Sequence, residues 1–297
     1  MIQTAETLDQ YLLDARRRLE EALADYLQFD ENCPKRLAEA MRYSLLAPAK
    51  RLRPILVLMA AEACGSPAAT AMPAACAIEM IHTYSLIHDD LPAMDDDDLR
   101  RGRPSCHKAF DEALAILAGD ALLAQAFEIV AREVQPPEVG ARCVAVLAEA
   151  AGPTQLVAGQ VEDLTDHDEE GSLELLESIH ARKTGAMLCV SLRLGALCAG
   201  STPAEEAALV EYGRRLGMAF QITDDLLDVR GDEQAMGKRV GKDAAHGKLT
   251  FPGLLGVEAS ARRAEALVAK ACDGLKSFSS AGDRLRALAR YVLERDH

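Results

Sequence analysis

Between residues 81 and 95 the chain reads Ile81-His82-Thr83-Tyr84-Ser85-Leu86-Ile87-His88-Asp89-Asp90-Leu91-Pro92-Ala93-Met94-Asp95, an apolar run that ends in carboxylates. A second apolar run leads into Thr223-Asp224-Asp225-Leu226-Leu227-Asp228. Crowded carboxylates repel one another and are costly to bury unless cations neutralise them. Oxygen ligands suit hard divalent ions, and Mg²⁺ commonly takes one or two carboxylates together with substrate phosphates. The two clusters therefore suggest a diphosphate bridged by metal ions.

Helical periodicity extends over nearly the whole chain, and we find no convincing run of alternating strand residues. The composition, rich in Ala, Leu, Glu and Arg, also favours helix. Stop signals predict roughly ten helices, and none of the breaks is long enough to be a domain linker. We therefore expect one all-α domain over residues 1–297. The predicted breaks are Asn32–Pro34, Gly65–Pro67, Pro136-Pro137, Gly152-Pro153, Gly200–Pro203, Gly231-Asp232 and Gly274.

Three central segments, 72–91, 113–131 and 186–199, are apolar nearly all round, which predicts helices buried among other helices. Both acidic clusters follow apolar helical runs of this kind. Ligands in helical bundles commonly bind between helices that project side chains inward. We therefore expect the two clusters to face each other across one central cavity.

Bulk composition restricts the class of partner and the compartment. The net charge of −14 argues against a nucleic-acid partner, which needs a basic face. Eight scattered cysteines form no C-x-x-C pair and indicate reduced thiols of a cytoplasmic protein. The N-terminus lacks the apolar block of a signal peptide. Arg193 and Asp120 interrupt the most apolar segments, so we expect no membrane span.

The spacing within each cluster suits a shared cation. Asp224 and Asp228 lie four residues apart on one helix face, where like charges are destabilising unless a cation bridges them. Pro92 is expected to end the first helix, which lets Asp95 turn back toward Asp89. An EF-hand is a poor fit because its glycine and terminal glutamate are lacking at the required offsets. Taken alone, such a cluster is equally consistent with an exposed acidic turn.

Basic residues accompany the acidic clusters. The segment Lys50–Pro54 is interpreted as the end of a helix, and His82 lies two turns before Asp89 on the same helical face. The arginine fork suits phosphate oxygens, while lysine serves as a point charge. Taken singly, each cation is as consistent with a solvated surface residue, and His82 with a core histidine. The candidate cations are Lys50, Arg53, Arg100, Arg101, Lys183, Lys238 and Lys248.

Taken together, these motifs resemble a known family. Residues 81–102 are similar to the first aspartate-rich motif of bacterial farnesyl diphosphate synthases, and residues 217–228 to the second. This ordered set of motifs is far more specific to the family than a single D-D-x-x-D motif. The resemblance covers the chain from about residue 5 to its end. Further blocks that match in the same order are Lys50–Pro54, Gly159-Gln160, His180–Gly185 and Gly237–Pro252.

The resemblance implies a trans-polyprenyl synthetase with the all-α isoprenoid-synthase fold. Mg²⁺, about three ions per site with Mn²⁺ as the alternative, would hold the allylic diphosphate between the clusters. The implied metal ligands are Asp89, Asp90, Asp95, Asp224, Asp225 and Asp228. Residues implied for the allylic diphosphate are Arg100, Lys183 and Lys238, with Lys248 as a further substrate-binding cation. Those implied for isopentenyl diphosphate are Lys50, Arg53, His82 and Arg101. Thr184 and Gln221 would lie along the allylic carbon chain and, with Lys183, act in catalysis.

The implied reaction condenses isopentenyl diphosphate with dimethylallyl or geranyl diphosphate by ionisation, attack and proton elimination. The expected product is (2E,6E)-farnesyl diphosphate, because the Tyr84 ring lies more than one helical turn before Asp89 and would stop a growing chain. The alternative interpretation is that Tyr84 is simply an aromatic residue of the core. The alternatives are a geranylgeranyl or geranyl diphosphate synthase, a terpene cyclase of the same fold, or a non-catalytic partner subunit. The resemblance also implies a homodimer.

One departure from the family concerns the segment before Lys50. The family usually has Gly-Gly there, whereas this chain has Ala47-Pro48-Ala49. Glycine permits unusual φ angles and close backbone approach, and Pro48 lacks an N–H donor. We therefore expect a difference in isopentenyl diphosphate affinity and none at the allylic site.

Overall fold

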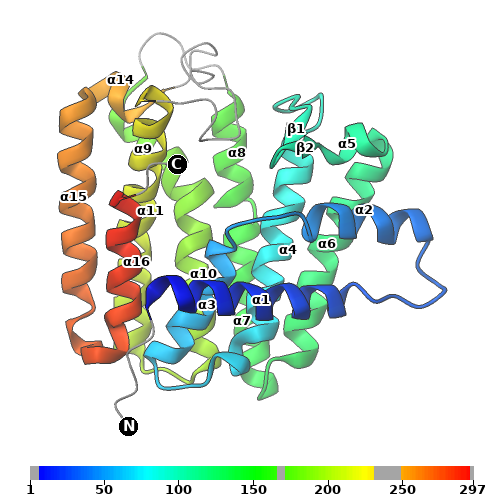
Figure 1. Ribbon diagram of the computed structural model, residues 1–297, viewed down its shortest axis with the longest axis horizontal. Helices are drawn as coiled ribbons and strands as arrows, with labels where there is room; N and C mark the ends of the chain where they lie inside the picture. Colours follow the sequence, from blue (N-terminus) through cyan, green and yellow to red (C-terminus); the bar gives the residue numbers. More distant parts are fainter. Residues whose placement is uncertain (1–6, 166–170, 231–248, 295–297) are drawn as a thin grey trace.

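The computed structural model describes residues 7–165, 171–230 and 249–294. These residues form helices, most of the long ones running side by side, and one short β-hairpin (Figure 1). The predicted all-α fold is confirmed. The elements of the first half are α1 (Leu8–Tyr26), α2 (Lys35–Leu45), α3 (Leu52–Ala63), η1 (Ala68–Ala71), α4 (Met72–Asp89), β1 (Leu99–Arg100), β2 (Arg103–Pro104), α5 (Cys106–Ala109), α6 (Glu112–Glu133) and α7 (Pro137–Ala151).

The second half continues the bundle. Its long helix α11 packs against α10 and α15, and the π-helical turn η2 joins α9 directly to α10. The elements are α8 (Leu156–Leu164), α9 (Leu173–His180), η2 (Ala181–Gly185), α10 (Ala186–Cys198), α11 (Pro203–Arg230), α14 (Phe251–Leu255), α15 (Val257–Gly274), η3 (Lys276–Gly282) and α16 (Asp283–Glu294).

The core centres on α4 and α10, most of whose residues are buried, as predicted for segments 72–91 and 186–199. Helix α10 packs against α3 and α11, and α4 packs against α6. The contact between α10 and α3 needs a glycine, because a Cβ on Gly195 would lie 2.1 Å from the carbonyl oxygen of Val57. Helix α1 lies across the long helices (Figure 1).

Helix α6 corrects the expectation that segment 113–131 is buried all round. Ile116 and Leu117 are 43% and 56% exposed. By length and composition α6 is the one helix among the described residues that is apolar enough to cross a membrane, and 39% of its most apolar window is buried. It packs along α4 and α7, so its inner face is core and its outer face is an apolar surface.

The interpretation of Lys50–Pro54 as the end of a helix is wrong. Helix α2 ends earlier, and α3 begins at Leu52. Pro54 is tolerated because the N–H groups of a first helical turn have no partner within the helix. Arg51 precedes α3 with φ 54°, a left-handed conformation that is uncommon outside glycine.

Candidate active site

The first acidic cluster begins where α4 ends. The backbone N–H of Asp95 donates to the carbonyl oxygen of Asp89 at 2.8 Å, which confirms that the chain turns back after Pro92. Asp89 and Asp90 are 9% and 2% exposed, whereas Asp95 is exposed. The turn therefore places two buried carboxylates beside a third that faces solvent.

Burial changes the proton affinity of this cluster. It raises the pKa of Asp89 to about 6, and the neighbouring charges of Asp95 and Asp90 act in the same direction. Lys183 and Arg100 oppose the shift. The Nζ atom of Lys183 lies 3.9 Å from Asp89 and 2.8 Å from Asp163. Lys183 thus connects η2 to α4.

Helix α8 supplies residues that the sequence reasoning did not assign. A Cβ on Gly159 would lie 2.8 Å from the backbone nitrogen of Lys183, so this glycine lets α8 pack closely on η2. Asp163 follows Gly159 by four residues and lies on the same side of α8, which brings it to Lys183. Neither side-chain atom of the buried Gln160 amide has a hydrogen-bond partner among the described residues. The Gly159-Gln160 block was the sequence signal for this contact.

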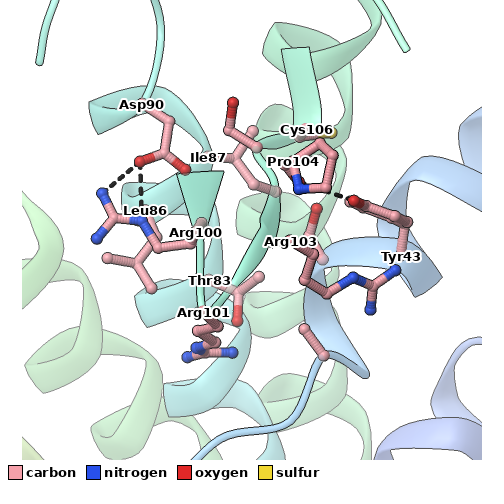
Figure 2. A pocket seen from close by; sticks show the side chains of 13 residues that line it. Tyr43, Thr83, Leu86, Ile87, Asp90, Arg100, Arg101, Arg103, Pro104 and Cys106 are labelled. Carbon is pink, nitrogen blue, oxygen red and sulfur yellow. Dashed lines mark hydrogen bonds and ion pairs between the residues drawn. The ribbon is translucent and has the colours of Figure 1, made fainter. Parts of the chain in front are cut away.

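The β-hairpin directs two consecutive arginines to different carboxylates. Its two-residue turn consists of Arg101 and Gly102, with φ 55° and 74°, as a type I′ turn requires. The Nε atom of Arg100 donates to Asp90 at 2.8 Å, and its Nη2 atom contacts the same oxygen (Figure 2). The Nη2 atom of Arg101 lies 4.0 Å from Glu79 instead.

A half-buried cluster of basic residues lies beside the hairpin. The Nη1 atom of Arg53 lies 3.1 Å from Nε2 of His82. Because a guanidinium can only donate, this nitrogen of His82 accepts, and the ring proton is assigned to Nδ1. Burial lowers the pKa of His82 well below its usual value, and Arg53 and Arg101 lower it further. His82 is therefore a neutral acceptor that orients Arg53. Lys50 lies at the surface just before α3.

The sequence reasoning also missed the counter-ion of this cluster. Glu79 is 1% exposed and accepts from the Nη1 atom of Arg51 at 2.6 Å. Arg51 also donates to the carbonyl oxygens of Leu45 and Ala47. A single acidic residue inside an otherwise apolar helix was the available signal, because a buried carboxylate needs a cationic partner.

The second acidic cluster lies in the last turns of α11. Asp225 is buried, and one of its oxygens accepts from the backbone N–H of Phe251 at 2.9 Å, so it anchors the start of α14. Asp224 and Asp228 are half-buried. Asp224 is close enough to Arg53 to raise its pKa, against the lowering by burial. Arg53 therefore feels the charge of the second acidic cluster as well as that of Glu79.

Gln221 lies on α11, and Thr184 lies on η2, which packs against α11. The Nε2 atom of Gln221 lies 3.2 Å from Nδ1 of His180, whose ring stacks on Phe251. Thr184 is half-buried. Two further candidates, Lys238 and Lys248, lie outside the described residues.

The donor set fits a hard divalent cation. The ligands predicted at both clusters are carboxylate oxygens, and the raised pKa of Asp89 reflects an acid held where a positive charge would stabilise its anion. Among the described residues, one ligand atom from each of Asp96, Asp98 and His107 lies within 4.8 Å of the other two, and the two aspartates are close to the first acidic cluster in the sequence. Asp98 also pairs with Lys108 at 2.8 Å.

Comparisons with known proteins identify the family of the chain. The family model "Polyprenyl synthetase" matches residues 34–285. The chain is 44% identical over 294 residues to farnesyl diphosphate synthase of Geobacillus stearothermophilus, covering 98% of this chain and 99% of the relative. It is 50% identical over 266 residues to geranylgeranyl pyrophosphate synthase 11, chloroplastic, of Arabidopsis thaliana, covering 87% and 74%. A crystal structure of an FPP/GFPP synthase from Zymomonas mobilis superposes with a TM-score of 0.87 at 39% identity, covering 96% and 98%.

The all-α bundle and its similarity to a solved prenyl synthase define the class of isoprenoid synthases. Within that class, the chain belongs to the polyprenyl synthetase family. It is a prenyltransferase, and the family expected from its motifs is confirmed.

Proposed function

We propose that the chain makes (2E,6E)-farnesyl diphosphate from isopentenyl diphosphate and dimethylallyl or geranyl diphosphate. Tyr84 is the observation that carries the C15 product. Its ring is 8% exposed on α4, five residues before Asp89, and it meets His88 edge-on at 5.8 Å. A prenyl chain anchored at Asp89 and growing back along α4 meets this ring.

The first step is departure of the allylic diphosphate. Mg²⁺ bound by Asp89, Asp90, Asp95, Asp224, Asp225 and Asp228 would supply positive charge for the leaving group. Lys183, held beside Asp89, adds a fixed cation, and Arg100 and Lys238 add further charge. Such prearranged charge favours the ionised state over the ground state. Lys248 is proposed as an additional substrate-binding cation.

The second step joins the two substrates. Lys50, Arg53, His82 and Arg101 are proposed to hold isopentenyl diphosphate, with neutral His82 orienting Arg53. Gln221 donates through Nε2 toward His180, so the side-chain carbonyl oxygen of Gln221 is left to stabilise the allylic cation. The hydroxyl oxygen of Thr184 is proposed to stabilise the same cation. Apolar walls exclude water that would quench the cation. The released pyrophosphate takes the proton that the adduct loses.

A C20 product is the second candidate, because the chain is 50% identical to a geranylgeranyl pyrophosphate synthase over 266 residues. A geranyl product would require chain growth to stop one unit earlier. The complete basic set argues against a terpene cyclase, which has no use for an isopentenyl pocket. Both acidic clusters are complete in the sequence, which argues against a non-catalytic partner subunit.

Product analysis tests the proposal. The protein is incubated with radiolabelled isopentenyl diphosphate, Mg²⁺ and each allylic primer, and the dephosphorylated products are separated by chain length. Farnesol as the main product supports the C15 assignment, and geranylgeraniol supports the second candidate. Absence of elongation with every primer overturns both.

We further propose a homodimer of one catalytic domain per chain, located in the cytoplasm. The exposed Ile116 and Leu117 of α6 give an apolar face suited to a second copy. The cysteines of the described residues are free, which suits a reducing compartment. Sedimentation of the wild type and of Leu117→Glu tests the dimer, since the charge on this face should yield monomers.

A further inference from the structure

The β-hairpin that carries Arg100 and Arg101 is fastened to α2 by one aromatic residue. The hydroxyl of Tyr43 donates to the carbonyl oxygen of Pro104 at 2.7 Å (Figure 2). The guanidinium carbon of Arg103 lies 3.9 Å from the centroid of the Tyr43 ring. Phe110 meets the same ring edge-on at 5.5 Å. Tyr43 thus contacts the second strand of the hairpin through both its ring and its hydroxyl.

The hairpin needs such an anchor. Each strand has two residues, and Leu99 is 63% exposed, so burial of this strand residue contributes little. An isolated two-stranded hairpin is marginal in water, and Arg101 adopts a left-handed conformation that costs further free energy. A small cavity, large enough for about one water, lies under the hairpin and is lined by Tyr43, Thr83 and both arginines. Packing beneath the hairpin is therefore incomplete, and contacts at its rim hold it.

We propose that Tyr43 is a positioning residue for both substrates. It touches neither reacting group, but it holds the hairpin in the position at which Arg100 contacts Asp90 and Arg101 approaches Glu79. This inference rests on the proposed function, in which Arg100 serves the allylic diphosphate and Arg101 serves isopentenyl diphosphate. One aromatic anchor then sets the affinity of two pockets.

Steady-state kinetics of Tyr43→Leu and Tyr43→Phe test the proposal, with Tyr291→Leu on α16 as the matched control. Tyr43→Leu removes ring and hydroxyl, and we expect KM for both substrates to rise about tenfold or more while kcat falls less. Tyr43→Phe keeps the ring and loses one hydrogen bond, so its KM values should rise no more than about fivefold. Chain length should be unchanged in all three variants.

Limited trypsin digestion separates local loosening of the hairpin from general destabilisation, because general destabilisation accelerates cleavage throughout the chain. Cleavage after Arg100 and Arg101 should accelerate in Tyr43→Leu relative to cleavage elsewhere in the chain, and it should not do so in the control. If Tyr43→Leu fails to fold, Arg103→Met removes the stacked cation and should raise both KM values in the same direction. Unchanged KM values in a folded variant, or a rise for one substrate alone, overturn the proposal.

The two proposals fail separately. If the wild type elongates no primer, the proposed function is wrong. Binding of inorganic pyrophosphate with Mg²⁺, measured by calorimetry on the same variants, then decides the role of Tyr43. Weaker binding by Tyr43→Leu supports positioning of the arginines, and equal binding rejects it.

Discussion

Lys183 and Asp89 come from different elements, η2 and α4, yet the ammonium of one lies 3.9 Å from a carboxylate oxygen of the other. Burial acts to lower the pKa of Lys183, but Asp163 and Asp89 raise it above its usual value. Lys183 is therefore a permanent cation at neutral pH. Its closest carboxylate is Asp163 at 2.8 Å, which holds the ammonium at the edge of the acidic cluster.

Replacement of Lys183 by Met should reduce kcat by about a hundredfold, because one fixed charge facing the leaving group is lost. The KM of isopentenyl diphosphate should change little, since the basic cluster is untouched. Steady-state assays in which each substrate is varied in turn measure both effects. Lys270→Met, an exposed cation on α15, serves as the control. A turnover number equal to that of the wild type would contradict the role of Lys183.

Asp89→Asn should stabilise the metal-free protein increasingly as pH rises from about 4 to about 6, and by a constant amount above that window. Burial raises the pKa of Asp89 from 3.8 to about 6, so the folded state binds its proton more tightly than the unfolded state does. The contribution of Asp89 to stability therefore falls as pH rises from about 4 to about 6. Asn avoids that loss of stability, and the gain in the free energy of unfolding should reach about 3 kcal/mol at pH 7.

Thermal unfolding of the two proteins with a chelator, from pH 4 to 8, checks this expectation. The difference in Tm should grow across the window and level off above it. Asp120→Asn, whose carboxylate is 60% exposed, should show no such dependence. A difference in Tm between the two proteins that does not change with pH would mean that Asp89 titrates like an exposed carboxyl group.

The local parts of this site could be predicted from the sequence. The turn from Asp89 to Asp95 depends on Pro92, which acts on its own neighbours. The partners of Glu79 and of Asp163 lie far away in the chain, and periodicity does not say which helices meet. The same limit applies to α6, because its residues are apolar nearly all round although its outer face is exposed. The hairpin was missed because two residues per strand are too few to alternate.

Tyr84→Ala should lengthen the product. The smaller side chain opens the space behind Asp89 along α4, so a C15 chain can accept further units and products of C20 or longer should appear. Tyr84→Phe keeps the ring and should retain the wild-type product. Chain lengths are compared by chromatography at equal conversion. An unchanged product in a folded Tyr84→Ala variant would show that another residue limits growth.

Substitution of Arg51 and Glu79 tests how much their ion pair contributes to the stability of the region where α3 begins. The two side chains are 0% and 2% exposed and lie 2.6 Å apart. Arg51→Met leaves Glu79 as a buried anion without this partner, and we expect the free energy of unfolding to fall by about 3–5 kcal/mol. Chemical denaturation measures the change, with Arg17→Met on the exposed face of α1 as control.

The double variant Arg51→Met with Glu79→Leu should recover most of that loss, because removal of both charges also removes the cost of burying them. Its KM for isopentenyl diphosphate should nonetheless differ from that of the wild type, because Arg101 has lost the carboxylate that it approaches at 4.0 Å. Recovered stability with altered KM would separate the two roles of Glu79. A double variant as unstable as the sum of its single substitutions would instead mean that this site depends on the hydrogen bonds of Arg51 to the carbonyl oxygens of Leu45 and Ala47.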